Sequence, residues 1–341
     1  MTAPPIVRID DAAGAGADLL GGKGASLARL SEAGLRVPPG FVVTTVAYRS
    51  AIGAELGDRV DAILAQDAAG AQVRELIANH PVDEALAAAV RSAYAELGDD
   101  VAVAVRSSSA AEDSADHSFA GEHDTYLWVR GADDVLAKLR ECWASLFTTR
   151  AIDYRRRVGP AAGGAEMAVV VQEMVPARSA GVFMTLNPEN GDRSKVAVES
   201  VWGLGEPLVS GTVTPDGFHL DKVTGEVVRR TVVAKPTELV RAPAGTGTTT
   251  ADVEPDRQET PSLDEAELVE LLRLARLVER HFGCPQDGEF AIGPGAAPDN
   301  VFLVQSRPET VWSRRARPAA SQGVTLMDSI LSNLVPDTGR E

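Results

Sequence analysis

Hydrophobic positions along the first half of the chain alternate between helical spacing and short apolar runs. Residues 22–30 and 83–97 carry apolar side chains three or four positions apart, and Gly98 follows the second stretch as a helix stop. Residues 41–45 and 101–105 are apolar runs of strand length. This pattern predicts helices and strands that follow one another along the chain.

The second half is richer in predicted strands. A Thr224-Gly225 turn inside residues 223–233 indicates a hairpin. The other candidate strands are residues 167–175, 182–185, 195–201, 217–220, 289–292 and 301–305. Together the two halves predict a mixed α/β protein.

Three further segments have distinct patterns. Residues 133–157 have acids early and arginines late, which predicts one long helix or two. Residues 242–261 have almost no large apolar side chains, and we expect an exposed loop. Ser262 and Glu265 form a predicted capping box at the start of the helix that follows this loop.

The C-terminal segment, residues 314–341, differs from the rest. A basic linker opens it, and apolar side chains then recur at helical spacing. These are Leu326, Met327, Ile330, Leu331 and Leu334. The pattern fits a helix packed on its own domain as well as a helix docked on a partner protein.

Charge, cysteine content and the absence of apolar runs exclude several classes of partner and site. With 33 Lys and Arg against 49 Asp and Glu, the net charge is −16, which disfavours nucleic acid and anionic membrane surfaces. Cys142 and Cys284 form no CxxC pair, so a disulfide scaffold and a structural zinc site are not expected. Because the sequence has no signal-peptide pattern and no run of about 18 apolar residues, we expect a cytoplasmic protein.

Two cationic side chains stand where a phosphate could bind. Lys23 lies in a Gly-Gly-Lys-Gly stretch, where glycines allow close backbone approach, although the P-loop spacing is absent. Arg106 ends an apolar strand and precedes serines, and a guanidinium can hold two phosphate oxygens at once. An ordinary glycine turn and a surface arginine in a salt bridge are the plain alternatives.

A second group lies near the end of the chain. Two neighbouring strands would place Glu289 and Gln305 close together, with Arg307 just beyond. Their oxygens are hard ligands that suit Mg²⁺, and with the cations above they could stabilise phosphoryl transfer. The residues from Gln172 to Val175 leave another strand and could offer backbone groups to an adenine edge. The alternatives are a surface salt-bridge network and a simple strand exit.

In this order the motifs resemble the N-terminal nucleotide-binding module of the phosphoenolpyruvate synthase and pyruvate phosphate dikinase family, which also includes rifampin phosphotransferase. The matching stretches lie between about residues 6 and 312. They are GGKGASLARLSEAGLRVPPGFVVTTVAYR, VAVRSSSAAEDSADHSFAGEHDTYL, VQEMVPARSAGVFMTLNP, VESVWGLGEPLVSGTVTPD, PQDGEFAI and LVQSRPETVW.

The resemblance implies an ATP-grasp fold with ATP between two α/β lobes, residues 1–180 and 181–313. It implies that Lys23 and Arg106 hold phosphates and that Arg307 grips phosphate during transfer. The other roles implied are a phosphate-covering loop with Gly121 and Thr125, adenine recognition by Gln172, Met174 and Val175, a sugar contact from Glu199, and Mg²⁺ ligation by Glu289 and Gln305. Three positions, Glu122, Glu173 and Gly288, depart from the usual family residues.

Family dikinases pass the β-phosphoryl group of ATP to a histidine on a swivelling domain and release AMP and phosphate. No histidine here stands in the expected Thr-Ser-His or Thr-Cys-His context, and His117 and His123 lie in the covering loop. We therefore expect the histidine, and the small-molecule acceptor, on a separate partner subunit, as in phenylphosphate synthase and cresol-phosphorylating synthases. The alternatives are a fragment of a longer family member, a carboxylate-activating ATP-grasp ligase and a non-catalytic ATP-sensing module.

Overall fold

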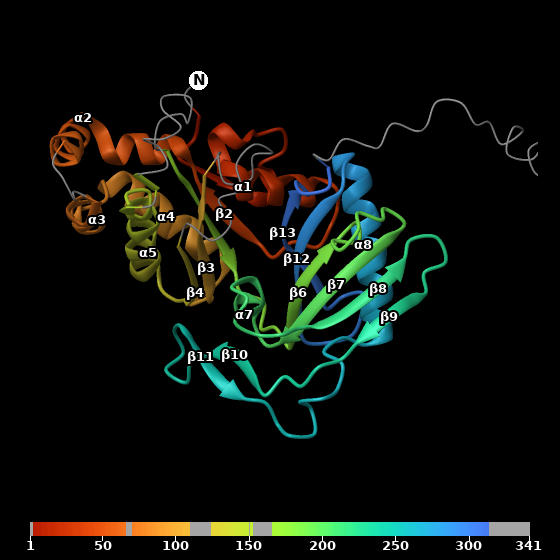
Figure 1. The fold of residues 1–341 in the computed structure, drawn as a ribbon. Helices are drawn as coiled ribbons and strands as arrows, with labels where there is room; N and C mark the ends of the chain where they lie inside the picture. Colours follow the sequence, from red (N-terminus) through yellow and green to blue (C-terminus); the bar gives the residue numbers. More distant parts are fainter. Residues whose placement is uncertain (1–2, 66–69, 110–123, 150, 153–165, 314–341) are drawn as a thin grey trace, which may run out of the picture.

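The structure is a computed structural model of the 341-residue chain (Figure 1). It describes residues 3–65, 70–109, 124–149, 151–152 and 166–313. Gly121, Glu122, His117, His123 and the predicted tail helix lie outside these residues. The architecture is mixed α/β, as the alternating pattern predicted.

A five-stranded antiparallel sheet forms the first half (Figure 1). Its order is β1 (Ile6–Arg8), β2 (Gly40–Val43), β5 (Ala168–Glu173), β3 (Val103–Ser108) and β4 (Thr125–Val129). Along β5, Val169 and Val171 belong to one apolar cluster and Val170 to another, because successive side chains of a strand point to opposite faces.

Helices cover both faces of this sheet. The Val169 face packs on four helices, while the Val170 face packs on α1. The four are α2 (Thr45–Leu64), α3 (Gly70–Asn79), α4 (Glu84–Leu97) and α5 (Ala132–Ser145). Helix α1 runs over Ala17–Glu32 and follows a short 3-10 turn, η1 (Ile9–Asp11). The predicted helical region 133–157 is thus broken after Ser145, and the chain is helical again at Thr149.

A six-stranded antiparallel sheet forms the second half. Its order is β13 (Val301–Pro308), β12 (Gln286–Ile292), β6 (Ser179–Met184), β7 (Lys195–Trp202), β8 (Asp216–Asp221) and β9 (Val227–Thr231). One face, with Phe183, Phe218 and Phe290, packs on α8 (Glu265–Phe282). The other face carries polar side chains and lies toward the first sheet.

The predicted loop at 242–261 is wrong in part. Strand β11 (Thr248–Asp252) lies within it and pairs with β10 (Thr237–Arg241) to form a separate two-stranded hairpin, low in Figure 1. Because β11 reads Thr-Thr-Thr-Ala-Asp, its β-branched threonines favour a strand without the apolar alternation that marks one in the sequence. A short helix, α7 (Glu206–Val209), lies close by.

The predicted capping box is also misplaced. Asp264 caps α8, its side chain accepting from the Glu267 N–H, while the Glu267 carboxylate accepts from the Asp264 N–H. Ser262 is fully buried and is bound instead to Asp216. Both registers satisfy the sequence rule, and the tertiary contact of Ser262 decides between them.

Among the helices of the described residues, none is both long enough and apolar enough to cross a membrane.

Candidate functional site

Arg106 joins the two sheets. It lies on β3 of the first sheet and its side chain is largely buried. One terminal nitrogen donates to the Val304 carbonyl oxygen at 2.7 Å. The other donates to Gln305 Oε1 at 2.7 Å and to Glu289 Oε2 at 3.2 Å. A first-sheet guanidinium therefore sits on three oxygens of β12 and β13.

A β-bulge creates this oxygen cluster. From Ile292–Val301 to Phe290–Leu303, strands β12 and β13 pair in regular register, which would put Val304 opposite Glu289. The register shifts there, and Gln305 takes that place instead. Since a bulge leaves one residue outside the ladder, the carbonyl of Val304 is available to Arg106.

Polar side chains continue in a row across the second sheet. Gln305 pairs with Glu289, Glu289 with Val182, and Val182 with Glu199. Directly paired residues present their side chains on the same face of a sheet. Glu199 therefore lies on the face that Arg106 contacts, two strands away from Glu289.

Arg307 lies one row further along the same face, opposite Asp287. Its Nε is 3.7 Å from Asp287 Oδ2. Burial raises the pKa of Asp287 to about 6, Arg307 opposes this rise, and Glu309 adds to it. Asp287 therefore joins the candidate site, although the sequence alone did not single it out. Its spacing of two from Glu289 on one strand places both side chains on one face, and this spacing could have indicated it.

Burial also raises the pKa of Glu199, and nearby His219 partly offsets this effect. His219 pairs with Ala197, so it lies one row from Glu199 on the same face. The carboxyl group of Glu199 is therefore easier to protonate than an exposed glutamate.

Lys23 is placed by a break in α1. Gly21 has φ 68° and ψ 173°, a conformation that interrupts the helix and favours glycine. A Cβ at Gly21 would collide with Ser108, whose hydroxyl accepts from the Gly24 N–H at 3.0 Å. Lys23 Nζ donates to the Ser107 carbonyl at 3.0 Å. Ser107 is the residue that follows Arg106, so the ammonium group of Lys23 lies close to the Arg106 backbone.

The same helix also contacts the second sheet. The hydroxyl of Ser26 donates to the Ser306 carbonyl of β13, between Gln305 and Arg307. Thus α1 and Arg106 approach the same stretch of β13 from the first half of the chain.

The predicted adenine-facing residues follow Arg106 along one face of the first sheet. Arg106 pairs with Val170, Gln172 lies two residues further on, and the Met174 N–H donates to the Ala102 carbonyl at 2.9 Å. The four residue steps from Val170 to Met174 correspond to ~13 Å at strand spacing. The structure thus separates a charged end of this face from an apolar end.

At the apolar end, the Gln172 amide donates to the Pro38 carbonyl at 3.3 Å. Val175 borders a cavity of about 200 Å³ that Pro38 and Phe302 also line. This cavity lies beside the segment for which adenine contacts were expected.

A larger cavity, of about 570 Å³, lies elsewhere, between β9 and α8. Val227, Arg230 and Glu265 are among its lining residues. None of the candidate site residues lines it, so it is separate from the cluster around Arg106.

Thr125 is the first residue of β4 and pairs with Arg106. It therefore lies on the Arg106 face of the first sheet. Gly121, the other residue expected in the covering loop, is outside the described residues, as are His117, Glu122 and His123.

The departure at Gly288 has a structural reason. A Cβ at this position would collide with the ring of Phe183. Phe183 is fully buried in the core beneath α8 and pairs with Gly288. The Phe183 ring thus occupies the space that a larger residue at position 288 would need. The neighbouring Glu289 still pairs with Gln305.

Glu289 and Gln305 are suited to a magnesium ion. Both supply oxygen donors, and the Arg106 guanidinium already rests on Glu289 Oε2 and Gln305 Oε1 as a cationic stand-in. Within the described residues, no three His, Cys, Asp or Glu side chains cluster as a metal site. An ion here would have few protein ligands, which is usual for Mg²⁺ bound together with phosphate.

Residues 17–326 match the family described as pyruvate phosphate dikinase, AMP/ATP-binding domain. The chain is 43% identical over 316 residues to a rifampicin phosphotransferase of Streptomyces sp, covering 89% of the chain and 36% of that protein.

Two further relatives have other names. One is the prodigiosin synthesizing transferase PigC of Serratia marcescens, 43% identical over 295 residues, covering 86% of the chain and 32% of the relative. The other is a phosphoenolpyruvate synthase of Aeropyrum pernix, 38% identical over 344 residues, covering 89% of the chain and 42% of the relative. The chain thus spans between 32% and 42% of the length of these relatives.

Proposed function

Since the chain belongs to the pyruvate phosphate dikinase AMP/ATP-binding domain family, we propose that it is the ATP-binding component of a dikinase-type phosphotransferase. It binds Mg-ATP between an N-terminal lobe, residues 1–180, and a C-terminal lobe, residues 181–313, in the manner of an ATP-grasp fold. The observation that carries the proposal is Arg106, which reaches from the first sheet to Glu289 and Gln305 of the second.

The triphosphate lies at the charged end of the first-sheet face that carries Arg106, between the two sheets. Lys23, Arg106 and Arg307 supply positive charge to the phosphate oxygens, and Thr125 adds a hydroxyl beside Arg106. The proposed phosphate-covering loop also includes Gly121, which lies outside the described residues. When phosphate enters, Arg106 exchanges part of its contact with Glu289 and Gln305 for phosphate oxygens.

The nucleoside lies toward the apolar end. Gln172 and the backbone of Met174 and Val175 contact adenine, beside the cavity at Pro38. Glu199 binds the sugar from the second sheet. Burial raises its pKa, and sugar hydroxyls would donate hydrogen bonds that stabilise the ionised carboxylate.

Glu289 and Gln305 would hold the magnesium ion, which supplies charge neutralisation for the phosphate oxygens when it is bound. The residues of the chain orient the phosphates, hold them with charge-assisted hydrogen bonds and exclude water from them.

Transfer of phosphorus needs a nucleophile that this site does not contain. In net terms ATP, water and a histidine give phosphohistidine, AMP and phosphate. A histidine-bearing partner supplies that nucleophile and passes the phosphoryl group to a small molecule, a phenol- or cresol-like alcohol being favoured. The relatives, of which the chain covers 36% and 42%, have room for such further parts.

Labelled ATP tests the proposal. Incubated with Mg²⁺ and a histidine-bearing partner, β-labelled ATP should leave acid-labile label on the partner, γ-labelled ATP should leave none, and AMP should form. Arg307→Ala and Glu289→Ala should abolish labelling without unfolding the chain. Formation of ADP alone would contradict the proposal, and ATP binding without transfer to any partner would favour an ATP-sensing module.

A further inference from the structure

Strand β4 contains a bulge. Val103 of β3 pairs with Val129 and Val105 pairs with Tyr126, so β4 has one residue more than β3 between these pairs. Trp128 lies in this interval with φ 56°, a value that is rare for a residue with a side chain. Bulges redirect side chains out of the regular alternation of a strand.

Trp128 packs on residues from both halves of the chain. The residue is 9% exposed and lies in a small cluster with Ala102, Leu204 and Leu239. Ala102 precedes β3, Leu204 follows β7 and Leu239 lies on β10. An aromatic residue of the first sheet is therefore buried in part against the β10–β11 hairpin and the end of β7.

Two more contacts reinforce this one. The Trp128 carbonyl accepts from the Gly247 N–H, between β10 and β11, at 3.1 Å. The guanidinium carbon of Arg241 lies 5.6 Å from the centroid of the Trp128 ring, within the range of a cation–π contact. Trp128 therefore contacts the β10–β11 hairpin in three ways: through its main-chain carbonyl, through the face of its ring and through apolar packing.

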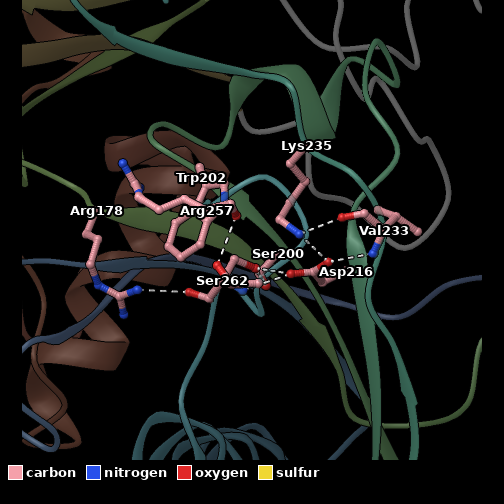
Figure 2. A network of polar contacts seen from close by, with 9 residues as sticks. Arg178, Ser200, Trp202, Asp216, Val233, Lys235, Arg257 and Ser262 are labelled. Atoms are coloured by element: carbon pink, nitrogen blue, oxygen red, sulfur yellow. Dashed lines mark hydrogen bonds and ion pairs between the residues drawn. The ribbon is translucent and has the colours of Figure 1, made fainter. Parts of the chain in front are cut away.

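The hairpin is anchored at its base by a buried carboxylate (Figure 2). Asp216 Oδ1 accepts from Lys235 Nζ at 2.6 Å and from the Val233 N–H at 3.1 Å. Asp216 Oδ2 accepts from both the N–H and the hydroxyl of Ser262 at 2.8 Å. Asp216 thus ties the chain that enters the hairpin to the chain that leaves it.

A second anchor lies between this base and the tip. The Leu204 N–H donates to the Leu239 carbonyl at 2.9 Å, and a Cβ at Gly203 would collide with that same carbonyl. Nearby, the Trp202 indole donates to the Arg257 carbonyl at 3.2 Å, a contact drawn in Figure 2. The hairpin is therefore bound to the end of β7 in the second sheet.

The geometry points to Trp128 as a positioning residue for the nucleotide site. Among the described residues strand β4 is an edge strand that pairs with β3, and it begins at Thr125, opposite Arg106. The hairpin gives β4 a second support through Trp128, three residues from Thr125. Trp128 thereby fixes Thr125 beside Arg106; this role rests on the proposed function.

The tryptophan ring can be tested apart from its N–H. Trp128 Nε1 is buried and has no hydrogen-bond partner among the described residues. Trp128→Phe keeps an aromatic ring without breaking a hydrogen bond, whereas Trp128→Ala removes the contact. Arg241→Ala removes only the cation from the ring, and Arg229→Ala is its control, an arginine on β9 that pairs with Glu189.

Hydrogen exchange by mass spectrometry and calorimetric titration with Mg-ATP, both on the full chain, test the inference. Trp128→Ala should speed exchange about tenfold in both β4 and the hairpin and weaken ATP binding at least fivefold. Trp128→Phe should stay within about twofold of wild type. Arg241→Ala should change the exchange rate and the ATP affinity in the same direction as Trp128→Ala, but by less. Arg229→Ala should change neither quantity.

Faster exchange confined to the hairpin, with β4 and ATP affinity unchanged, would overturn the inference, and so would equal losses in Trp128→Phe and Trp128→Ala. If Trp128→Ala does not fold, Arg241→Ala decides by the same two readings. A wild-type chain that binds no ATP refutes the proposed function alone, because the exchange measurement without nucleotide still reports whether the hairpin supports β4.

Discussion

At the scale of single residues, the contacts between the two sheets are arranged around Arg106. Its guanidinium is held by a main-chain carbonyl, an amide and a carboxylate, all from the second sheet. Hydrogen bonds that involve a charged group are about twice as strong as neutral ones. Arg106 therefore joins the two sheets through Glu289 and Gln305, the residues that in the proposed function bind magnesium.

Glu199 links stability to pH. Burial raises its pKa, so the folded protein retains a proton that the unfolded chain would release. Stability therefore decreases as pH rises from the unfolded pKa, about 4.3, through the raised folded value. Glu199→Gln cannot ionise and should be more stable than wild type at about pH 7, with the pH-dependent part of this gain absent at about pH 4.

Urea denaturation of both proteins at the two pH values measures this difference. A stability gain of equal size at both values would contradict the assignment, because it would not arise from ionisation. Glu199→Gln should at the same time bind ATP more weakly, since an amide is a poorer acceptor for sugar hydroxyls than a carboxylate.

At the scale of elements, interruptions of regular structure position the functional groups. The break in α1 at Gly21 places Lys23, the bulge between β12 and β13 places Gln305, and the bulge in β4 places Trp128. Each interruption exposes a backbone group or redirects a side chain at the junction of the two sheets.

Gly21→Ala tests the first of these interruptions. The positive φ should cost about 1–3 kcal/mol, and the collision of the new Cβ with Ser108 should add to this. Gly34→Ala is the control, because Gly34 has φ 70° and no atom within 4 Å of an added Cβ. Thermal unfolding should show the larger loss for Gly21→Ala, together with weaker ATP binding. Equal losses would show that the close approach to Ser108 has no importance.

The anchor of the hairpin carries a second prediction at this scale. Lys235 and Asp216 form an ion pair with side chains only 3% and 0% exposed. Lys235→Met should cost about 3–5 kcal/mol because it leaves a buried carboxylate without its partner. The exposed pair of Arg229 and Glu189 serves as control, and Arg229→Met should cost less than about 1 kcal/mol.

Chemical denaturation measures both losses. Adding Asp216→Asn to Lys235→Met should recover part of the loss, because it removes the uncompensated charge. Similar costs for Lys235→Met and Arg229→Met would mean that the Asp216 anchor contributes no more than a surface pair.

Local patterns in the sequence predict most of the helices and strands of this chain. Strand register and the hairpin strand β11 depend instead on tertiary contacts. The α1 and α4 helices and the strand pair carrying Glu289 and Gln305 follow from apolar spacing. The register that brings Gln305 opposite Glu289 depends on a bulge at Val304, which no local pattern indicates. Likewise β11 lacks apolar alternation, and its strand forms through pairing with β10.

At the scale of the whole molecule, the first half of the chain meets the second sheet through polar contacts and meets the β10–β11 hairpin through an apolar cluster. Arg106 and Ser26 make the polar contacts, and Trp128 with Leu239 lies in the apolar cluster. A bound triphosphate would add its charge between groups that belong to different sheets. Affinity for ATP should therefore depend on residues from both halves of the chain.

Calorimetric titration of Mg-ATP into the wild-type chain, Lys23→Ala and Arg307→Ala tests this claim most directly, with Arg229→Ala on β9 as control. We expect one ATP per chain, a loss of about tenfold to hundredfold in affinity for each site variant, and no change in the control. Wild-type binding that neither site variant weakens, or that Arg229→Ala weakens equally, would contradict this claim.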